Sequence, residues 1–252
     1  MGFRSGNDAV LVKTLTYFVH QKRGAPISAP RFFYGDTMLK ALIFDFDGLI
    51  LDTETPEFDV LQEIYAKYDV ELSIEKWGKI IGGSGATEFD PVSDIEHLSG
   101  VKIPRQTIME RWRSEADARI ALNPILPGVL ELLGDAKDRG VKLAVASSSP
   151  HSWVDSHLQR LGIFDRFDHI ICIDDVTRSK PSPELFLLAL SKLKLSADQA
   201  IIFEDSPNGV KAANAAGIHV VAVPNPITSQ LSFTGKFMRL NTLSDFLLAK
   251  FL

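Results

Sequence analysis

The sequence contains one cysteine in 252 residues, carries no excess of positive charge, and has no uninterrupted apolar run of membrane-spanning length. The single thiol, Cys172, excludes an internal disulfide and a cysteine-based zinc site. Its isoleucine-rich surroundings indicate a buried strand residue rather than a reactive thiol. The net charge of −5 gives no sign of nucleic-acid binding. We therefore expect a cytoplasmic, monomeric protein with neither a nucleic-acid nor a membrane partner.

Residues 1–37 differ in composition from the rest of the chain. They contain five basic but only two acidic residues and show no clear hydrophobic periodicity. Such a segment is typical of a transit peptide, which would imply organellar targeting. Because the fold is predicted to be complete from Met38 onward, we favour a disordered or non-native extension.

From Met38 onward, short apolar strands alternate with helices. The expected strands are Ala41–Phe46, Val141–Ser147, His169–Ile173, Ala200–Glu204 and His219–Val223. The expected helices are Val129–Arg139, His151–Leu161, Glu184–Leu193 and Val210–Ala216. This alternation predicts an α/β fold with a doubly wound parallel sheet that is covered on both faces. We assign residues 38–54 and 127–252 to this core.

Residues 55–126 interrupt the alternation. Apolar residues recur there at helical spacing, first at Phe58, Leu61 and Ile64, and later at Ile108 and Trp112. The pattern predicts a helical subdomain inserted between the first and second strands. Its glycine-rich turn, residues 82–87, is either a plain connection or a loop whose backbone approaches the ligand and selects the substrate.

Two acidic residues directly follow the first buried strand. Asp45 and Asp47 are two residues apart, so their side chains point to the same side of an extended chain. Like charges at the end of a buried strand cost folding energy unless a cation or a phosphate group makes use of them. A simple turn explains Gly48 but not the two acids.

Ligands of parallel sheets bind beyond the carboxyl ends of the strands, so polar residues there are expected to converge. Those that follow the later strands are Ser147, Ser148, Ser149, Lys180, Glu204 and Asp205. A cluster of carboxylates requires a cation, and oxygen ligands suit Mg²⁺. An ammonium group, hydroxyls and backbone N–H groups suit phosphoryl oxygens. An aspartate can accept a phosphoryl group covalently while a second acid transfers protons.

Four stretches together resemble the signatures of the haloacid dehalogenase superfamily, in particular its beta-phosphoglucomutase-like phosphatases. They are D-F-D-G-L-I-L-D-T from residue 45, A-S-S-S from 146, K-P-S-P from 180 and E-D-S-P-N-G-V-K-A-A-N-A-A-G from 204. The resemblance covers the chain from Met38 to its end. It implies a Rossmann-like core with an inserted helical cap, and a Mg²⁺-dependent phosphatase. The substrate would be a small phosphorylated metabolite such as a sugar phosphate.

The same resemblance implies roles for individual residues. Asp45 would be the nucleophile and Asp47 the general acid and base. Ser147 would bind the transferring phosphoryl group, and Lys180 would steady it. Mg²⁺ would be held by Asp45, Asp205 and the backbone carbonyl of Asp47. The residues expected to contact the substrate or to support these groups are Gly48, Ser148, Glu204 and Asn208.

Glu57 bears on the choice of activity. Mutases of this branch resemble the pattern D-T-x-x-x-H, and Glu57 occupies the histidine position here. The departure favours water as the final acceptor, which makes a sugar-phosphate mutase the alternative enzyme. A non-enzymatic alternative is a regulatory protein that binds phosphate esters, but the presence of both Asp45 and Asp47 speaks against it.

Overall fold

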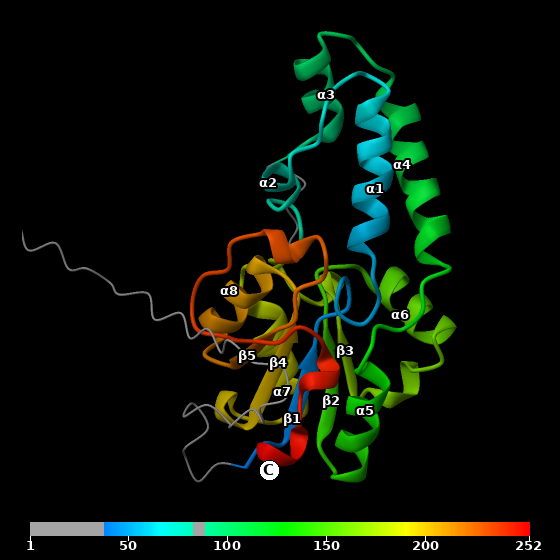
Figure 1. The fold of residues 1–252 in the computed structure, drawn as a ribbon. Helices are drawn as coiled ribbons and strands as arrows, with labels where there is room; N and C mark the ends of the chain where they lie inside the picture. Colours follow the sequence, from blue (N-terminus) through cyan, green and yellow to red (C-terminus); the bar gives the residue numbers. More distant parts are fainter. Residues whose placement is uncertain (1–37, 83–88) are drawn as a thin grey trace, which may run out of the picture.

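The structure is a computed structural model that describes residues 38–82 and 89–252 (Figure 1). The predicted extension 1–37 and residues 83–87 of the predicted loop lie outside these ranges. Six parallel strands form one sheet in the order β3-β2-β1-β4-β5-β6. They are β1 Ala41–Phe44, β2 Lys142–Ala146, β3 His169–Ile171, β4 Ala200–Glu204, β5 His219–Ala222 and β6 Met238–Arg239.

β1 lies in the middle of the sheet, where both faces are buried. Phe44 is in register with Val145 of β2 on one side and with Phe203 of β4 on the other. The two-residue alternation of a strand sends Phe44 into one hydrophobic core and Ile43 into a second core across the sheet. This double burial explains why the strand reads as a continuous apolar run.

Helices cover both faces of the sheet (Figure 1). The core on one face includes side chains of α7 and α8, and the core on the other face includes side chains of α5 and α6. These helices are α5 Val129–Asp138, α6 His151–Arg160, α7 Glu184–Leu193 and α8 Pro207–Ala216. Short 3₁₀ turns are η3 Phe164–Arg166, η4 Ile173–Asp175, η5 Ala197–Gln199, η6 Thr228–Gln230, η7 Leu243–Asp245 and η8 Leu248–Lys250. The predicted doubly wound α/β fold is thereby confirmed.

Among the described residues, four helices precede α5 in the long segment between β1 and β2. They are α1 Glu54–Ala66, α2 Ile74–Trp77, α3 Pro91–Ser99 and α4 Arg105–Ile120. α1 and α4 lie side by side and rise from the end of the sheet (Figure 1). The Trp112 indole N–H donates to the Glu57 carbonyl at 3.1 Å, and Arg119 forms an ion pair with Glu63, so the two helices are also joined by polar contacts. None of the helices in the described ranges is long and apolar enough to cross a membrane.

The predicted elements are present, with small differences at their ends. β3 stops at Ile171 because the chain turns into η4 after Cys172. α8 begins three residues earlier than predicted, because the Ser206 hydroxyl caps it and accepts from the Gly209 N–H at 3.0 Å. The two-residue edge strand β6 was not predicted, since so short a segment has no recognisable pattern.

Candidate active site

The carboxyl ends of β1 and β4 lie next to each other and carry most of the predicted acidic residues. Asp45 follows β1 directly, and its backbone N–H donates to the Phe203 carbonyl of β4 at 2.9 Å. The Asp45 side chain is buried there beside Glu204 and Asp205. One carboxylate oxygen from each of these three residues lies within 4.8 Å of the others. The sheet therefore brings together acids that are far apart in the sequence.

Lys180 neutralises part of this charge. Its side chain is fully buried, and its ammonium group donates to Asp45 Oδ1 and to Glu204 Oε1 at 2.6 Å each. Burial alone would lower the pKa of Lys180, but the two carboxylates outweigh burial and raise it, so the ammonium stays charged. Burial and the charge of Glu204 raise the pKa of Asp45 to about 8, against the opposing effect of Lys180. One buried cation therefore leaves the cluster with excess negative charge.

The start of α8 holds the second carboxylate oxygen of Glu204 in place. Its Oε2 accepts from both the backbone N–H and the hydroxyl of Ser206, at 2.9 Å each. The same carboxylate lies against the backbone of Gly209, where an added Cβ would stand 1.7 Å from Oε1. Both oxygens of Glu204 thus have partners, and Gly209 is the residue that leaves room for them.

We expect Gly209→Ala to destabilise the protein by about 1–3 kcal/mol, because the carboxylate of Glu204 must move away from its donors. The matched control is Gly134→Ala in α5, where an added Cβ meets nothing within 4 Å. That change should stabilise the protein by roughly 0.5–1 kcal/mol, since alanine is the better helix former. Urea unfolding of both variants measures the difference. Equal effects of the two substitutions would contradict the close contact between Gly209 and Glu204.

Asp205 presents an unpaired oxygen to the cluster. Its Oδ2 accepts from the Asn225 side-chain amide at 2.8 Å, whereas Oδ1 is buried without a hydrogen-bond partner among the residues that the structure describes. Gly48 lies against the same carboxylate with φ +75, and a Cβ there would come within 2.3 Å of Oδ2. A buried, unpartnered carboxylate oxygen beside Asp45 is costly unless it binds a cation. Hard oxygen donors in this arrangement fit Mg²⁺.

Asp47 points away from that cluster and towards the loop after β2. Its Oδ2 accepts from the hydroxyls of Ser149 at 2.6 Å and Ser147 at 3.3 Å. Its Oδ1 accepts from the indole N–H of Trp153 at 2.9 Å. The carboxylate is therefore held in a defined orientation beside Asp45, as a group that transfers protons requires. Ser147 is itself fully buried, and its hydroxyl also accepts from the Ser149 N–H.

Two other predicted residues contact the segment that precedes residue 83. The Ser148 hydroxyl donates to the Gly82 carbonyl at 3.1 Å, and the Asn208 side-chain amide donates to the Ile81 carbonyl at 2.9 Å. These bonds tie the loop after β2 and the first turn of α8 to the inserted helical segment. The structure thus places Ser148 and Asn208 between the sheet and that segment.

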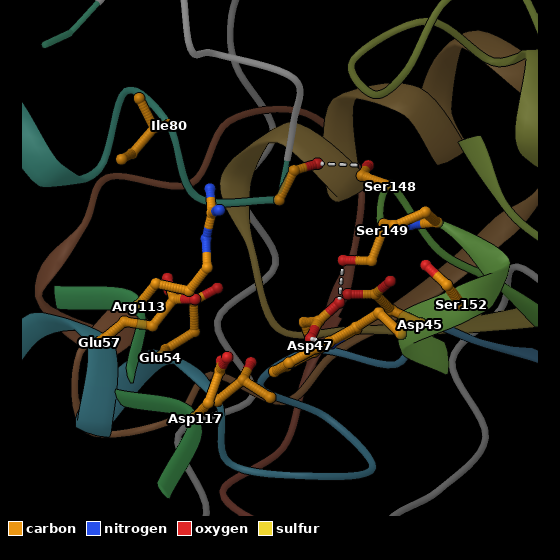
Figure 2. A pocket seen from close by; sticks show the side chains of 14 residues that line it. Asp45, Asp47, Glu54, Glu57, Ile80, Arg113, Asp117, Ser148, Ser149 and Ser152 are labelled. Atoms are coloured by element: carbon orange, nitrogen blue, oxygen red, sulfur yellow. Dashed lines mark hydrogen bonds between the residues drawn. The ribbon is translucent and has the colours of Figure 1, made fainter. Parts of the chain in front are cut away.

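A cavity of about 640 Å³ opens beside Asp45 and Asp47. Figure 2 shows both aspartates and Ser149 along one side of it. Side chains of the inserted helices face them, and these are Glu54, Glu57, Arg113 and Asp117. The cavity therefore lies between the ends of the strands and the helices α1 and α4.

The two glutamates of α1 have perturbed acidities. Burial raises the pKa of Glu57 to about 8, and the charges of Asp47 and Asp117 act in the same direction. Burial and the charge of Glu57 raise the pKa of Glu54 well above its usual range. Perturbed carboxyl groups that line a cavity are typical of functional sites.

Sequence reasoning did not assign Trp153, Asn225, Glu54, Arg113 or Asp117 to the site. Asn225 could have been found, since it follows β5 at the same edge of the sheet as the other strand-end residues. Trp153 lies in the first turn of α6, and only the orientation of that helix directs its N–H to Asp47. The remaining three belong to α1 and α4, and a helical pattern does not reveal which exposed face looks towards the sheet.

Comparison with known proteins finds relatives that are described as hydrolases or phosphatases. Residues 42–223 match a family model described as haloacid dehalogenase-like hydrolase. The chain is 44% identical over 212 residues to "Putative phosphatase YhcW" of Bacillus subtilis (strain 168), across 84% of this chain and 96% of that protein. It is 31% identical over 183 residues to "Phosphorylated carbohydrates phosphatase" of Thermotoga maritima, across 71% and 82% of the two chains.

The fold also has a close counterpart among solved structures. The crystal structure of CbbY from Rhodobacter sphaeroides in complex with phosphate superposes with a TM-score of 0.63. The two sequences are 27% identical, and the match covers 82% of this chain and 96% of the other.

Proposed function

The chain belongs to the haloacid dehalogenase-like hydrolase family, and from this premise we propose that it is a Mg²⁺-dependent phosphatase of small phosphorylated metabolites that works through an aspartyl phosphate on Asp45. Its relatives identify it as a phosphoric monoester hydrolase. The observation that carries the finer proposal is the position of Asp45. This carboxylate is held by Lys180 at one oxygen and lines the cavity together with Asp47.

The proposed reaction has two steps. In the first, an Asp45 oxygen attacks phosphorus, the bond between phosphorus and the alcohol oxygen breaks, and Asp47 donates a proton to that oxygen. In the second, Asp47 takes a proton from water, the water oxygen attacks phosphorus, and the bond to Asp45 breaks. Inorganic phosphate leaves, and both aspartates return to their starting states. Lys180 keeps Asp45 oriented and offsets negative charge during both steps.

Asp45, Asp205 and the Asp47 backbone carbonyl are the groups that would hold Mg²⁺. The unpartnered Oδ1 of Asp205 and the excess negative charge of the cluster support this assignment. When bound, the ion offsets the negative charge of the phosphoryl group. We further propose that residues 55–126 act as a cap that limits the access of bulk water to the cavity.

The proposed activity is tested by measuring phosphate release from p-nitrophenyl phosphate with Mg²⁺ and with EDTA. We expect release with Mg²⁺ and almost none with EDTA. Release that continues unchanged in EDTA would contradict the metal dependence. The absence of release under any metal condition would contradict the proposed mechanism as a whole.

Metal binding should also be visible as a change in stability. Because burial and neighbouring acids raise the pKa values of Asp45 and Asp205, the metal-free protein should lose stability as the pH rises from about 4 to about 8. Mg²⁺ should raise the melting temperature by about 5–10 °C at a concentration about 100 times its Kd. The increase should be larger at pH 8 than at pH 6, because protons compete for the same oxygens.

Asp205→Ala provides the specific check on this stabilisation. The variant should lose most of the Mg²⁺-induced increase in melting temperature and require more Mg²⁺ for activity. Sodium chloride at matched ionic strength is the control for general salt effects. An unchanged Mg²⁺ titration of the variant would remove Asp205 from the metal site.

A further inference from the structure

The two carboxylate oxygens of Asp47 have hydrogen-bond donors of different kinds. Oδ1 accepts from the indole N–H of Trp153 at 2.9 Å. Oδ2 accepts from the hydroxyls of Ser149 at 2.6 Å and Ser147 at 3.3 Å. An indole nitrogen can only donate a hydrogen bond, whereas a hydroxyl can donate or accept by rotating about its C–O bond. The two oxygens therefore differ in how well their partners tolerate a proton on the carboxyl group.

The proposed reaction requires Asp47 to carry a proton before the first step. A protonated carboxyl group has one hydroxyl oxygen, which donates, and one carbonyl oxygen, which is the better acceptor. Because Trp153 offers only an N–H, its hydrogen bond is strongest when Oδ1 is the carbonyl oxygen. The proton then lies on Oδ2, where the Ser149 hydroxyl can bond to the charged or the protonated oxygen. The hydrogen bonds thus favour one of the two possible proton positions.

Trp153 is held firmly enough to impose this choice. It lies in the first turn of α6, where its backbone N–H donates to the Pro150 carbonyl at 3.0 Å. Its ring packs against the hydrophobic core and meets the ring of His157 edge-on, with 4.3 Å between the centroids. An indole that packing already orients presents its N–H without a further loss of side-chain entropy. The direction of the donor to Oδ1 is therefore set by α6 and its packing.

The Ser149 side of Asp47 borders the space where the reacting groups would stand. Asp47 and Ser149 both line the cavity, and Figure 2 shows the hydrogen bond between them at its edge. The loop that carries Ser149 is itself fixed, because the Ser149 backbone N–H donates to the hydroxyl of the fully buried Ser147 at 3.0 Å. Oδ2 and its serine partner are thus positioned to exchange a proton with a molecule in the cavity.

We propose that Trp153 is a positioning residue that makes Oδ2 of Asp47 the oxygen that gives and takes the proton. In the first step the proton on Oδ2 moves to the alcohol oxygen as the bond from that oxygen to phosphorus breaks. In the second step Oδ2 takes a proton from the water whose oxygen attacks phosphorus. Oδ1 accepts from the indole N–H throughout. This inference rests on the proposed phosphatase activity and adds to it the residue that selects the reacting oxygen.

The test compares two substrates of similar shape whose leaving groups differ in their need for an acid. The p-nitrophenolate group departs without a proton, whereas the phenolate of phenyl phosphate is a poorer leaving group and gains from one. Trp153→Phe keeps an aromatic ring but removes the N–H. The variant should lower the ratio of kcat/KM for phenyl phosphate to that for p-nitrophenyl phosphate by about tenfold, which is part of the about 10²–10⁴-fold that a positioned acid contributes.

The control is Trp112→Phe, which removes an indole N–H that donates to the backbone carbonyl of Glu57 at 3.1 Å. This variant should keep the wild-type ratio. Ser149→Ala should lower the ratio as Trp153→Phe does, and Ser149→Thr, which retains a hydroxyl, should recover most of it.

An unchanged ratio in Trp153→Phe would overturn the proposal. If both kcat/KM values fall together, Trp153 contacts the substrate instead. If only the melting temperature falls, Trp153 serves packing alone. A wild type that hydrolyses p-nitrophenyl phosphate but not phenyl phosphate would show that no acid assists the leaving oxygen, and that result would also overturn the proposal.

The hydrogen bond itself can be detected without turnover. The chain has three tryptophans, so protein labelled with ¹⁵N-tryptophan should show three indole N–H signals, which single Trp→Phe variants assign. Asp47→Ala removes the acceptor of Trp153. The Trp153 signal should therefore shift more than those of Trp77 and Trp112, and its proton should exchange faster with water. A Trp153 signal that does not move would contradict the bond to Asp47.

The wild type with Mg²⁺ distinguishes failure of this inference from failure of the proposed function. If it releases phosphate from both aryl phosphates and Trp153→Phe leaves the ratio unchanged, only the role of Trp153 is wrong. If it releases phosphate from neither compound, the proposed function itself fails.

Discussion

Asp45→Asn is expected to reduce the hydrolysis of p-nitrophenyl phosphate by about 10⁴-fold or more while the protein stays folded. An amide oxygen is too weak a nucleophile to attack phosphorus, and no other carboxylate occupies the same position. The fold should persist because the substitution removes one negative charge from a buried cluster that has an excess of it. Lys180 keeps Glu204 as a partner at 2.6 Å. The measurements are steady-state kinetics and a thermal melt in EDTA.

Asp59→Asn is the control for this prediction, since it makes the same chemical change at an exposed position of α1. It should retain wild-type turnover and a wild-type melting temperature. Turnover by Asp45→Asn within tenfold of the wild type would remove Asp45 from the role of nucleophile. A large loss of stability in Asp45→Asn would instead mean that its charge is needed for folding.

Lys180→Met is expected to lower the free energy of unfolding by about 3–5 kcal/mol and to abolish activity. The ammonium group is the only cation that contacts Asp45 and Glu204 among the described residues, and all three side chains are buried. Without it, two carboxylates lose a charged hydrogen-bond donor and cannot move into water. Urea unfolding at pH 7 in EDTA measures the effect.

Two comparisons define the origin of that loss. Lys211→Met removes an exposed lysine from α8 and should change stability by no more than about 0.5 kcal/mol. In the double variant Lys180→Met with Glu204→Gln, the side chain at position 204 carries no charge. Less buried charge is then left without a partner, so part of the stability should return. A Lys180→Met variant as stable as the wild type would show that the buried ion pairs contribute nothing to folding.

The core of the fold and the polar residues at the carboxyl ends of its strands could be predicted, because both follow from local sequence patterns. Continuous apolar runs identified β1 and β4 as strands buried on both faces, and both are fully buried. The rule that ligands bind beyond the ends of parallel strands then brought Asp45, Lys180 and Glu204 together. The structure adds the distances, which show that the Lys180 ammonium donates one hydrogen bond to each of the two carboxylates.

The wall of the cavity was not predictable, for a physical reason. Glu57 drew attention because a family pattern has histidine there, but nothing in the sequence places it opposite Asp47. Its direction depends on how α1 packs against α4, and that packing joins residues more than 50 positions apart, as in the bond from the Trp112 indole to the Glu57 carbonyl. Asp117 is an exposed helix residue whose role depends on the same arrangement.

The most direct test of the aspartyl-phosphate mechanism uses Asp47→Asn with p-nitrophenyl phosphate. The p-nitrophenolate group departs without help from an acid, so the first step should proceed, while the second step lacks the base that deprotonates water. We therefore expect a burst of p-nitrophenol and, after an acid quench, a phosphoryl group that peptide mass spectrometry locates on Asp45. A burst with the phosphoryl group on another residue, or with none on the protein, would contradict the mechanism.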